Sequence, residues 1–246
     1  MTETQNIPWK RTAVEAAAIV ASILLAFAID AGWQEYVEDQ RAREVLIALL
    51  DDFETTKANI KGWRNFHLAV QQSNTKLLKA VTSSEITLTN DQIGRLLSEL
   101  SWWDGESHFS TGALNSLVYG GELSLIEDDA LRQLLADWPS QIQYFESQQQ
   151  QDYDFFLNVW TPFLRANSYL PLQSTIDTPV PGRPEDPTLV IDLQLEGTWS
   201  YAEMVASKKF HNVLAQKSWI QFDILVAFDK ADVLIDQTIQ RIESKL

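Results

Sequence analysis

The sequence predicts an all-α protein in which one membrane-spanning helix is followed by an antiparallel helical bundle. The first observation is an apolar run near the amino terminus, where Ser22 is the only polar residue between Ala16 and Ile29. The second is that no proline occurs between this run and Pro139. Over that length apolar residues recur every three or four positions, which is the spacing of one helix face. The expected parts are a short cytoplasmic tail (1–12), a transmembrane helix (13–33) and an extracytoplasmic helical domain (34–246).

Three interpretations of the apolar run are open: a retained membrane anchor, a cleaved signal peptide and a helix buried in the protein. A run of about 14 apolar residues is short for a membrane span, and such lengths also occur in buried helices and signal peptides. A cleaved signal peptide is supported by Lys10 and Arg11 before the run and by the small-x-small pattern Ala26-Phe27-Ala28.

The flanking aromatic residues favour a retained membrane anchor. Trp9 lies just before the run, and Trp33 and Tyr36 lie just after it, as aromatic residues do at both surfaces of a bilayer. A helix from Trp9 to Trp33 covers about 36 Å, which suits a hydrocarbon core of roughly 30 Å and part of each interface. We therefore expect the lipid bilayer to be a partner of this chain.

Positive charge beside the run predicts its orientation. Lys10 and Arg11 adjoin its amino-terminal side, whereas the first positive residue on the other side is Arg41. Because positive residues remain on the cytoplasmic side, we expect the amino terminus inside and the large domain outside. This describes a single-pass protein of the inner (cytoplasmic) membrane with its domain in the periplasm, if the source is Gram-negative.

Two ionisable residues, Glu15 and Asp30, lie at the ends of the anchor. An acid inside a membrane segment is a candidate for pairing with a neighbour, but Glu15 is close enough to the headgroups to snorkel. The alternative is a hydrogen bond from Glu15 to another subunit's helix. One side of the anchor carries small residues that would allow close approach of a second helix: Ala13, Ala17, Ala21 and Ala28.

Parts of the chain resemble a widespread bacterial family of uncharacterised single-pass membrane proteins. The resemblance is carried by Glu15, SILLAFAID at 22–30, Trp33-Gln34-Glu35, LLDDF at 49–53, GALNSL at 112–117, GELSLI at 121–126 and Leu131-Arg132. It covers roughly the first 150 residues of this sequence and implies a membrane-tethered helical domain. It implies no catalytic residues.

Helical spacing predicts the remaining elements. The first helix should continue to about Thr82, followed by an extended connector and helices over 91–100 and from Ser110 or Thr111 to Val118. We then expect a longer helix from Glu127 or Asp128, a short one over 199–207 and a last one over 208–244. Pro139 should kink the longer helix or begin a new one, and Pro162 should end or bend it. The stripe of the first helix is Leu46, Leu49, Phe53, Thr56, Ile60, Trp63, His67, Val70, Leu77 and Val81.

The stretch 168–198 is the only proline-rich part of the chain and should be a long surface excursion. Loops of this length are often functional or disordered, and this one is the most plausible specificity loop. Within it, apolar alternation over 188–195 could form a short strand.

Composition limits the partners. The net charge of −15 repels phosphate backbones, so we expect no nucleic acid partner. The absence of cysteine excludes disulfides, thiol catalysis and cysteine-ligated metals. Nine tryptophans indicate either a large aromatic core or an interface. The candidates for an interface or pocket are Trp102, Trp103, Trp138 and Trp160.

A search for catalytic patterns gives no candidate. The sequence lacks a phosphate-binding glycine loop, a GxSxG elbow, an HExxH motif and an EF-hand loop. His67, His108 and His211 are far apart, and His67 and His211 are more typical of packed histidines. The pairs Asp51-Asp52 and Asp128-Asp129 could act as acids or bases only if buried, and helix-start charge explains the second pair. We expect no enzyme activity, no metal and no cofactor.

Two functions remain. The first is an accessory subunit that docks on, or braces, other membrane-protein subunits. The second is a ligand-sensing bundle that signals through a partner. A pocket lined by the candidate tryptophans would favour sensing, and a broad exposed apolar patch would favour docking. We expect the first.

Overall fold

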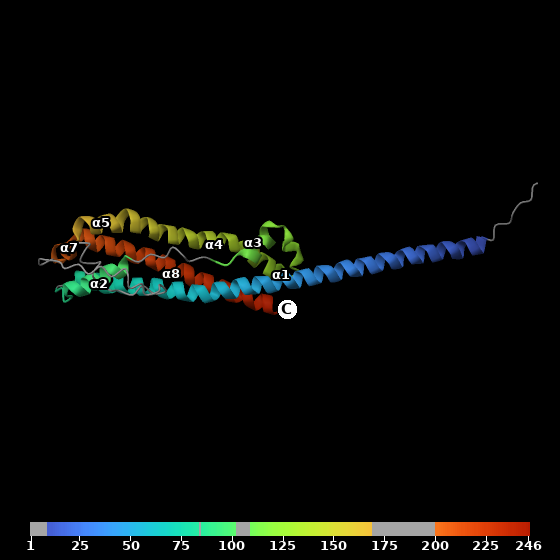
Figure 1. The fold of residues 1–246 in the computed structure, drawn as a ribbon, viewed down its shortest axis with the longest axis horizontal. Coiled ribbons are helices and arrows are strands. Elements are labelled where there is room, and N and C mark those ends of the chain that lie inside the picture. Colours follow the sequence, from blue (N-terminus) through green and yellow to red (C-terminus); the bar gives the residue numbers. More distant parts are fainter. Residues whose placement is uncertain (1–8, 84, 102–108, 169–199) are drawn as a thin grey trace, which may run out of the picture.

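The computed structural model describes residues 9–83, 85–101, 109–168 and 200–246, with side chains from residue 13 onward. Every regular element in these ranges is a helix, as predicted (Figure 1). The elements are α1 (Trp9–Thr82), α2 (Asn90–Leu100), α3 (Gly112–Tyr119), η1 (Glu122–Leu125), α4 (Asp129–Phe155), η2 (Phe156–Trp160), α5 (Thr161–Asn167), α7 (Ala202–Ala206) and α8 (Lys208–Glu243).

The helix α1 is 74 residues long, or about 110 Å at 1.5 Å per residue. Its first part projects away from the rest of the molecule, and its second part lies within the bundle (Figure 1). The helix ends where Thr82 Oγ1 donates to the Leu78 carbonyl, at 2.8 Å. The predicted continuous helix up to Thr82 is therefore confirmed.

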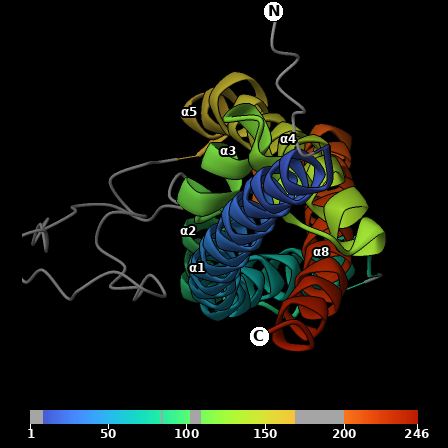
Figure 2. The ribbon, with the colours of Figure 1, turned by 90° about the vertical axis from the view of Figure 1, so that its right-hand side faces the viewer.

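Three long helices, α1, α4 and α8, form the bundle, which is antiparallel as predicted (Figures 1 and 2). Contacts between α1 and α8 run in opposite order along the two helices, since Lys57 pairs with Asp236 at 2.5 Å and Arg64 pairs with Asp229 at 2.7 Å. The helix α4 is also antiparallel to α8, because Trp138 bonds Thr238 near one end and Asp152 bonds Lys217 near the other. Both α1 and α4 thus pack against α8, which completes the core.

The predicted α1 stripe is the α1 side of this core. Leu49 and Val70 are fully buried and Thr56 is 1% exposed, while Trp63 is partly buried against the same cluster. From α4 and α8 the core receives Leu131, Leu135, Trp138, Phe145, Phe155, Phe210, Leu214, Ile224, Phe228, Ile235 and Ile242. One apolar core therefore extends along the whole bundle.

Capping residues mark the beginnings of α2 and α4. Thr89 caps α2 in a capping box with Gln92. The cap of α4 is Asp128, whose carboxylate accepts the Leu131 N–H at 2.8 Å, so helix-start charge is the role of this residue. After α3 the chain turns at Gly121, whose φ of 77° is left-handed and suits glycine.

The two prolines of the third long segment behave differently from each other. Pro139 lies well inside α4, which continues through it, so the alternative that a new helix begins at Pro139 is wrong. Pro162 lies in the first turn of α5, directly after the π-helical turn η2. There the Thr161 N–H bonds the Phe156 carbonyl, five residues back. The helical backbone therefore continues past Pro162 through a wider turn, and the alternative that the helix ends there is wrong.

Several predictions lie outside the described residues. These are the excursion after Ser168, the strand over 188–195, Trp102 and Trp103, and His108.

Candidate functional site

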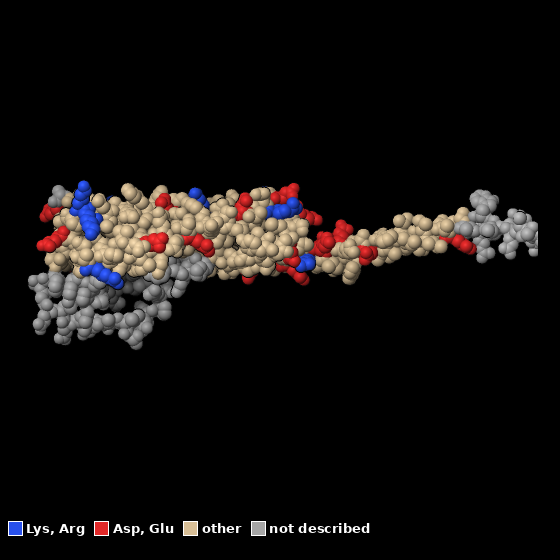
Figure 3. Space-filling model, turned by 90° about the horizontal axis from the view of Figure 1, so that it is seen from above, with Lys and Arg blue, Asp and Glu red and all other residues tan. Residues whose placement is uncertain are grey.

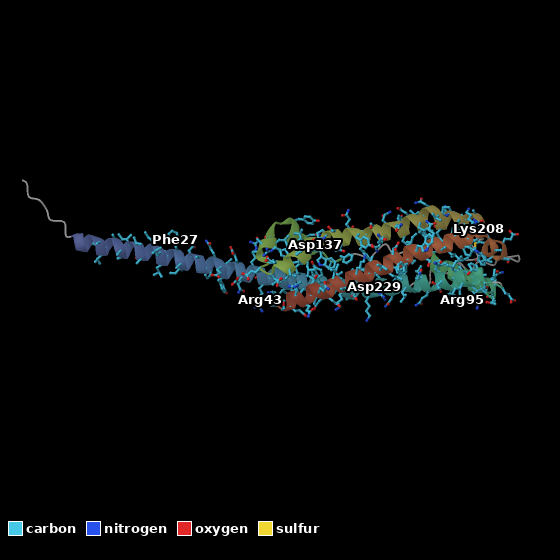
Figure 4. The ribbon with its side chains drawn as sticks, turned by 180° about the vertical axis from the view of Figure 1, so that it is seen from behind. Phe27, Arg43, Arg95, Asp137, Lys208 and Asp229 are labelled. Atoms are coloured by element: carbon cyan, nitrogen blue, oxygen red, sulfur yellow. The ribbon has the colours of Figure 1, made fainter. Side chains whose placement is uncertain are left out.

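The amino-terminal part of α1 is exposed over residues 13–41. Its large apolar side chains keep most of their surface accessible, with Val14 69%, Leu24 63% and Phe27 67% exposed (Figure 4). By length and composition this segment could cross a membrane, and none of its apolar window is buried. The alternative of a helix buried in the protein's own core is therefore wrong.

The segment 34–44, which we call the stalk, joins the apolar segment to the bundle. It spans about 16 Å of helix, and the core begins at Leu46, which is 8% exposed. Arg41 of the stalk pairs with Glu122 of η1. Because the helix is continuous from the apolar segment into the core, the stalk fixes the direction in which the bundle projects.

The aromatic residues after the apolar run lie together on its exposed surface. Trp33 and Tyr36 are 64% and 55% exposed, and their ring centroids are 5.8 Å apart. One turn before the stalk, Asp30 accepts a hydrogen bond from Gln34 Nε2 at 3.3 Å. Glu15 is exposed as well. This arrangement suits side chains at an interface between apolar and aqueous phases.

The basic and aromatic residues before the run are Trp9, Lys10 and Arg11. Their backbone forms the first turn of α1. Their side chains lie outside the described part of the structure.

The two described candidate tryptophans belong to the core. Trp138 is 2% exposed, and its indole N–H donates to Thr238 Oγ1 at 3.2 Å. Trp160 is 1% exposed and donates to Ser101 Oγ at 2.9 Å. Their polar atoms are satisfied within the protein, so neither is an exposed interface residue. The large aromatic core, the other interpretation of the tryptophan content, is what the structure shows at these positions.

A buried polar network crosses the middle of the bundle. Lys217 Nζ lies 2.7 Å from Asp152 Oδ1, and Gln221 Nε2 donates to Asp152 Oδ2 at 3.1 Å. Gln221 Oε1 lies 2.9 Å from His67 Nδ1. All four residues are 3% exposed or less. The network thus joins α8, α4 and α1 through hydrogen bonds.

This network is built to hold charge rather than to react with a substrate. The Lys217 ammonium also lies 5.7 Å from the centroid of the Phe155 ring, a favourable cation–π distance. A charged pair this deeply buried is tolerated only with good geometry and further hydrogen bonds. Nearby, Asn74 Nδ2 donates to the Leu214 carbonyl at 2.9 Å. Because these side chains are buried, a dissolved substrate has no access to them in this structure.

Sequence reasoning identified His67 as a packed histidine, which is confirmed, but missed Asp152 and Lys217. The helical spacing of apolar residues around Lys217 could have indicated that this lysine is buried. Lys217 falls between Val213 and Ile220 on the apolar stripe of α8, a position where a charge requires a buried partner. The other histidine, His211, bonds the Val205 carbonyl through Nε2 at 2.8 Å.

Asp52 is the second polar residue with a defined role. Its carboxylate accepts the Ser110 hydroxyl at 2.6 Å and the Ala113 N–H at 2.8 Å, while Thr56 Oγ1 accepts the Ser110 N–H at 2.9 Å. Asp52 therefore caps the first turn of α3 from the neighbouring helix α1. An acid or base role, considered for the pair Asp51-Asp52, has no support in this geometry.

Among the open grooves on the described surface of the bundle, two lie beside exposed aromatic or acidic residues. The first, which we call the α4–α8 groove, has a volume of about 720 Å³. Its lining is Gln151, Asp154, Phe155, Asn158, Val159, Asn212, Ala215, Gln216, Trp219, Ile220 and Asp223. The second lies where the stalk meets the bundle, also about 720 Å³, and its lining includes Glu35, Glu38, Asp39, Glu127 and Asp128. Acidic side chains gather at this junction (Figure 3).

Among the described residues no three histidine or acidic side chains are placed to hold a metal ion.

Comparisons with protein-family models, with curated proteins and with solved structures found no match.

Proposed function

We propose that this protein is a membrane-anchored, non-catalytic accessory subunit that holds a rigid helical bundle outside the inner membrane and binds other membrane proteins. The observation that carries the proposal is the continuity of α1, which is one helix from the exposed apolar segment to the core. An apolar segment this exposed is costly in water, and a bilayer removes that cost.

The charge distribution supports the orientation with the bundle outside. Lys10 and Arg11 adjoin the apolar segment, while the first positive residues after it, Arg41 and Arg43, lie near the far end of the stalk. The positive-inside rule puts the basic end in the cytoplasm. The acidic junction disfavours binding to anionic headgroups, so the bundle projects away from the bilayer.

Interaction is favoured over ligand sensing by the location of the aromatic residues. The described candidates for a ligand pocket, Trp138 and Trp160, are core residues with internal partners. In contrast, α8 exposes Trp219 and Phe222, which are 71% and 59% accessible. Exposed apolar surface of this kind is typical of a protein-binding face.

The anchor and its orientation can be tested with single-cysteine variants, because the native chain has no cysteine. Asn65→Cys lies on an exposed position of α1, and Thr2→Cys lies before the anchor. We expect membranes to retain both variants after carbonate washing. A membrane-impermeant maleimide should label Asn65→Cys in spheroplasts and label Thr2→Cys only after permeabilisation. Extraction by carbonate, or the opposite labelling pattern, contradicts the proposal.

The interaction can be tested by purification of the intact protein in mild detergent, followed by mass spectrometry. We expect membrane proteins to accompany the wild-type chain in fixed ratio. Glu15→Leu tests whether the anchor contributes a polar contact, in which case these proteins are lost or reduced. Purification of the chain with no companion above background would contradict the accessory role.

A further inference from the structure

The helix α8 has a second apolar face, opposite to the one that forms the core. On the outward side, apolar residues follow one another at steps of four, three and four, and a fifth follows one heptad later, past Asp229: Ala215, Trp219, Phe222, Val226 and Val233. Trp219 is 71%, Phe222 59% and Val233 56% exposed. Steps that alternate between three and four put residues on one seam, the pattern by which helices pair. We call these five residues the outer seam.

The outer seam lies on a free side of the bundle. Figure 2 shows α8 at one edge, with α2 and α3 on the other side of the molecule. Within the described ranges the elements packed on α8 are mainly α1, α4 and α7, and they take its core face. The outer seam is therefore available to a partner.

The membrane-distal half of the seam is poor in charge. Between Asn212 and Val226 the only charged residues are Lys217, which is buried, and Asp223. Most of the remaining acidic surface of α8 follows from Asp229 onward, toward the membrane (Figure 4). In a chain of net charge −15, an uncharged aromatic patch has the composition of an interface core.

The α4–α8 groove lies directly beside this patch. Trp219 stands on its edge, and Phe155, Val159 and Ile220 contribute apolar lining. The ridge formed by Trp219 and Phe222 and the α4–α8 groove thus lie at the same level along the bundle axis. A two-fold interface needs this relation, because each copy presents the same surface and the ridge of one must meet the groove of the other.

We infer that the outer seam of α8 joins two copies of this chain, side by side in the same membrane. The inference rests on the proposed anchor, since two anchored copies share one orientation and their α8 helices run parallel. Parallel pairing along the seam would set Ser218 of one copy near Asp223 of the other, and Leu225 near Lys230. No like charges meet at these flanking positions. The next position of the seam after Val226 is Asp229, which is paired with Arg64 of its own chain, so the contact is limited to the stretch before it.

The size of the contact determines where the dimer forms. The stretch 212–226 covers about 22 Å of helix, so the contact falls short of the roughly 800 Å² per partner of a standard stable interface. Confinement of both copies to one membrane raises their effective concentration. We therefore expect pairing in membranes and dissociation on dilution in detergent.

Cysteine crosslinking in native membranes tests this directly. Val226→Cys lies on the outer seam. The control is Asn65→Cys, which is exposed on α1. It lies at a similar level along the bundle axis, because its neighbour Arg64 bonds Asp229 of α8. With copper-phenanthroline as oxidant, we expect Val226→Cys to shift from the mass of one chain to that of two, and Asn65→Cys to stay monomeric. Adding Trp219→Glu to Val226→Cys should abolish the dimer, with the Tm of the variant unchanged.

Each other outcome overturns the inference in a distinguishable way. Equal crosslinking at residues 226 and 65 would mean random collision. If carbonate washing leaves the protein in the membrane but Val226→Cys forms no dimer, the pairing along the outer seam is rejected and the proposed anchor is not. Release of the protein by carbonate would reject the proposed function, and with it the parallel pairing.

Discussion

Lys217 and Asp152 form an ion pair of 2.7 Å between α8 and α4 in which both residues are 3% exposed or less. Gln221 donates a further hydrogen bond to the Asp152 carboxylate, and it also contacts His67 of α1. The pair therefore ties together all three long helices at one level. An offset of one helix against another would leave a buried charge without its partner, so the pair specifies the helix register.

The first prediction concerns this pair. Lys217→Met leaves the Asp152 carboxylate buried without its cation, which costs roughly 3–5 kcal/mol of stability. The double variant Lys217→Met with Asp152→Asn removes both charges and keeps an acceptor for Gln221, so its loss should be smaller. Urea unfolding of the detergent-solubilised chain, followed by circular dichroism, measures both. A double variant no more stable than the single one would contradict the role of the pair.

The second prediction separates core tryptophans from surface tryptophans. Trp160 is 1% exposed and Trp219 is 71% exposed. Trp160→Ala should lower the free energy of unfolding by about 3–5 kcal/mol, because it opens a cavity, and should leave Ser101 without its donor. Trp219→Ala should change it by less than about 0.5 kcal/mol, as surface substitutions do. Thermal melts of the two variants beside the wild type provide the comparison.

The third prediction concerns the cap of α3. Asp52→Ala removes the acceptor of both the Ser110 hydroxyl and the Ala113 N–H. We expect a loss of about 1–2 kcal/mol, the upper part of the range for a helix cap. Asp52→Asn retains one acceptor oxygen and should lose less. Hydrogen exchange should show faster exchange in α3 of the alanine variant, and unchanged exchange there would disprove the cap.

The fourth prediction is a pH dependence. The Leu131 N–H bond and Lys245 lower the pKa of Asp128 below its ordinary value, so its charged form is favoured in the folded state. Its contribution to stability is complete above the unfolded pKa of about 3.9 and is lost as the pH falls through the lowered folded pKa. Asp128→Asn keeps a capping side chain but loses the charge that pairs with Arg241 and Lys245.

The Tm difference between wild type and Asp128→Asn should therefore be largest near neutral pH and should shrink below about pH 3.9. Asp129→Asn is the matched control, since Asp129 occupies the next position and its side chain is 91% exposed. A Tm difference that stays constant with pH would show that the charge of Asp128 does not contribute.

The sequence determined the helices because local rules suffice for them. The continuous α1, the start of α4 at Asp128 and the buried stripe from Leu46 to Val81 all follow from spacing and end chemistry. The exposed apolar segment before Trp33 was equally evident, since its composition differs from that of every other stretch.

Only the tertiary structure decided which polar residues meet and which aromatic residues are covered. Asp152 and Lys217 are 65 residues apart, and Asp52 reaches Ala113 across 61 residues, so no local pattern joins them. Likewise, Trp138 and Trp160 are buried while Trp219 is exposed, although all three lie on helices. The reason is that burial depends on which face of a helix another helix covers, and this is fixed by packing between segments far apart in the chain.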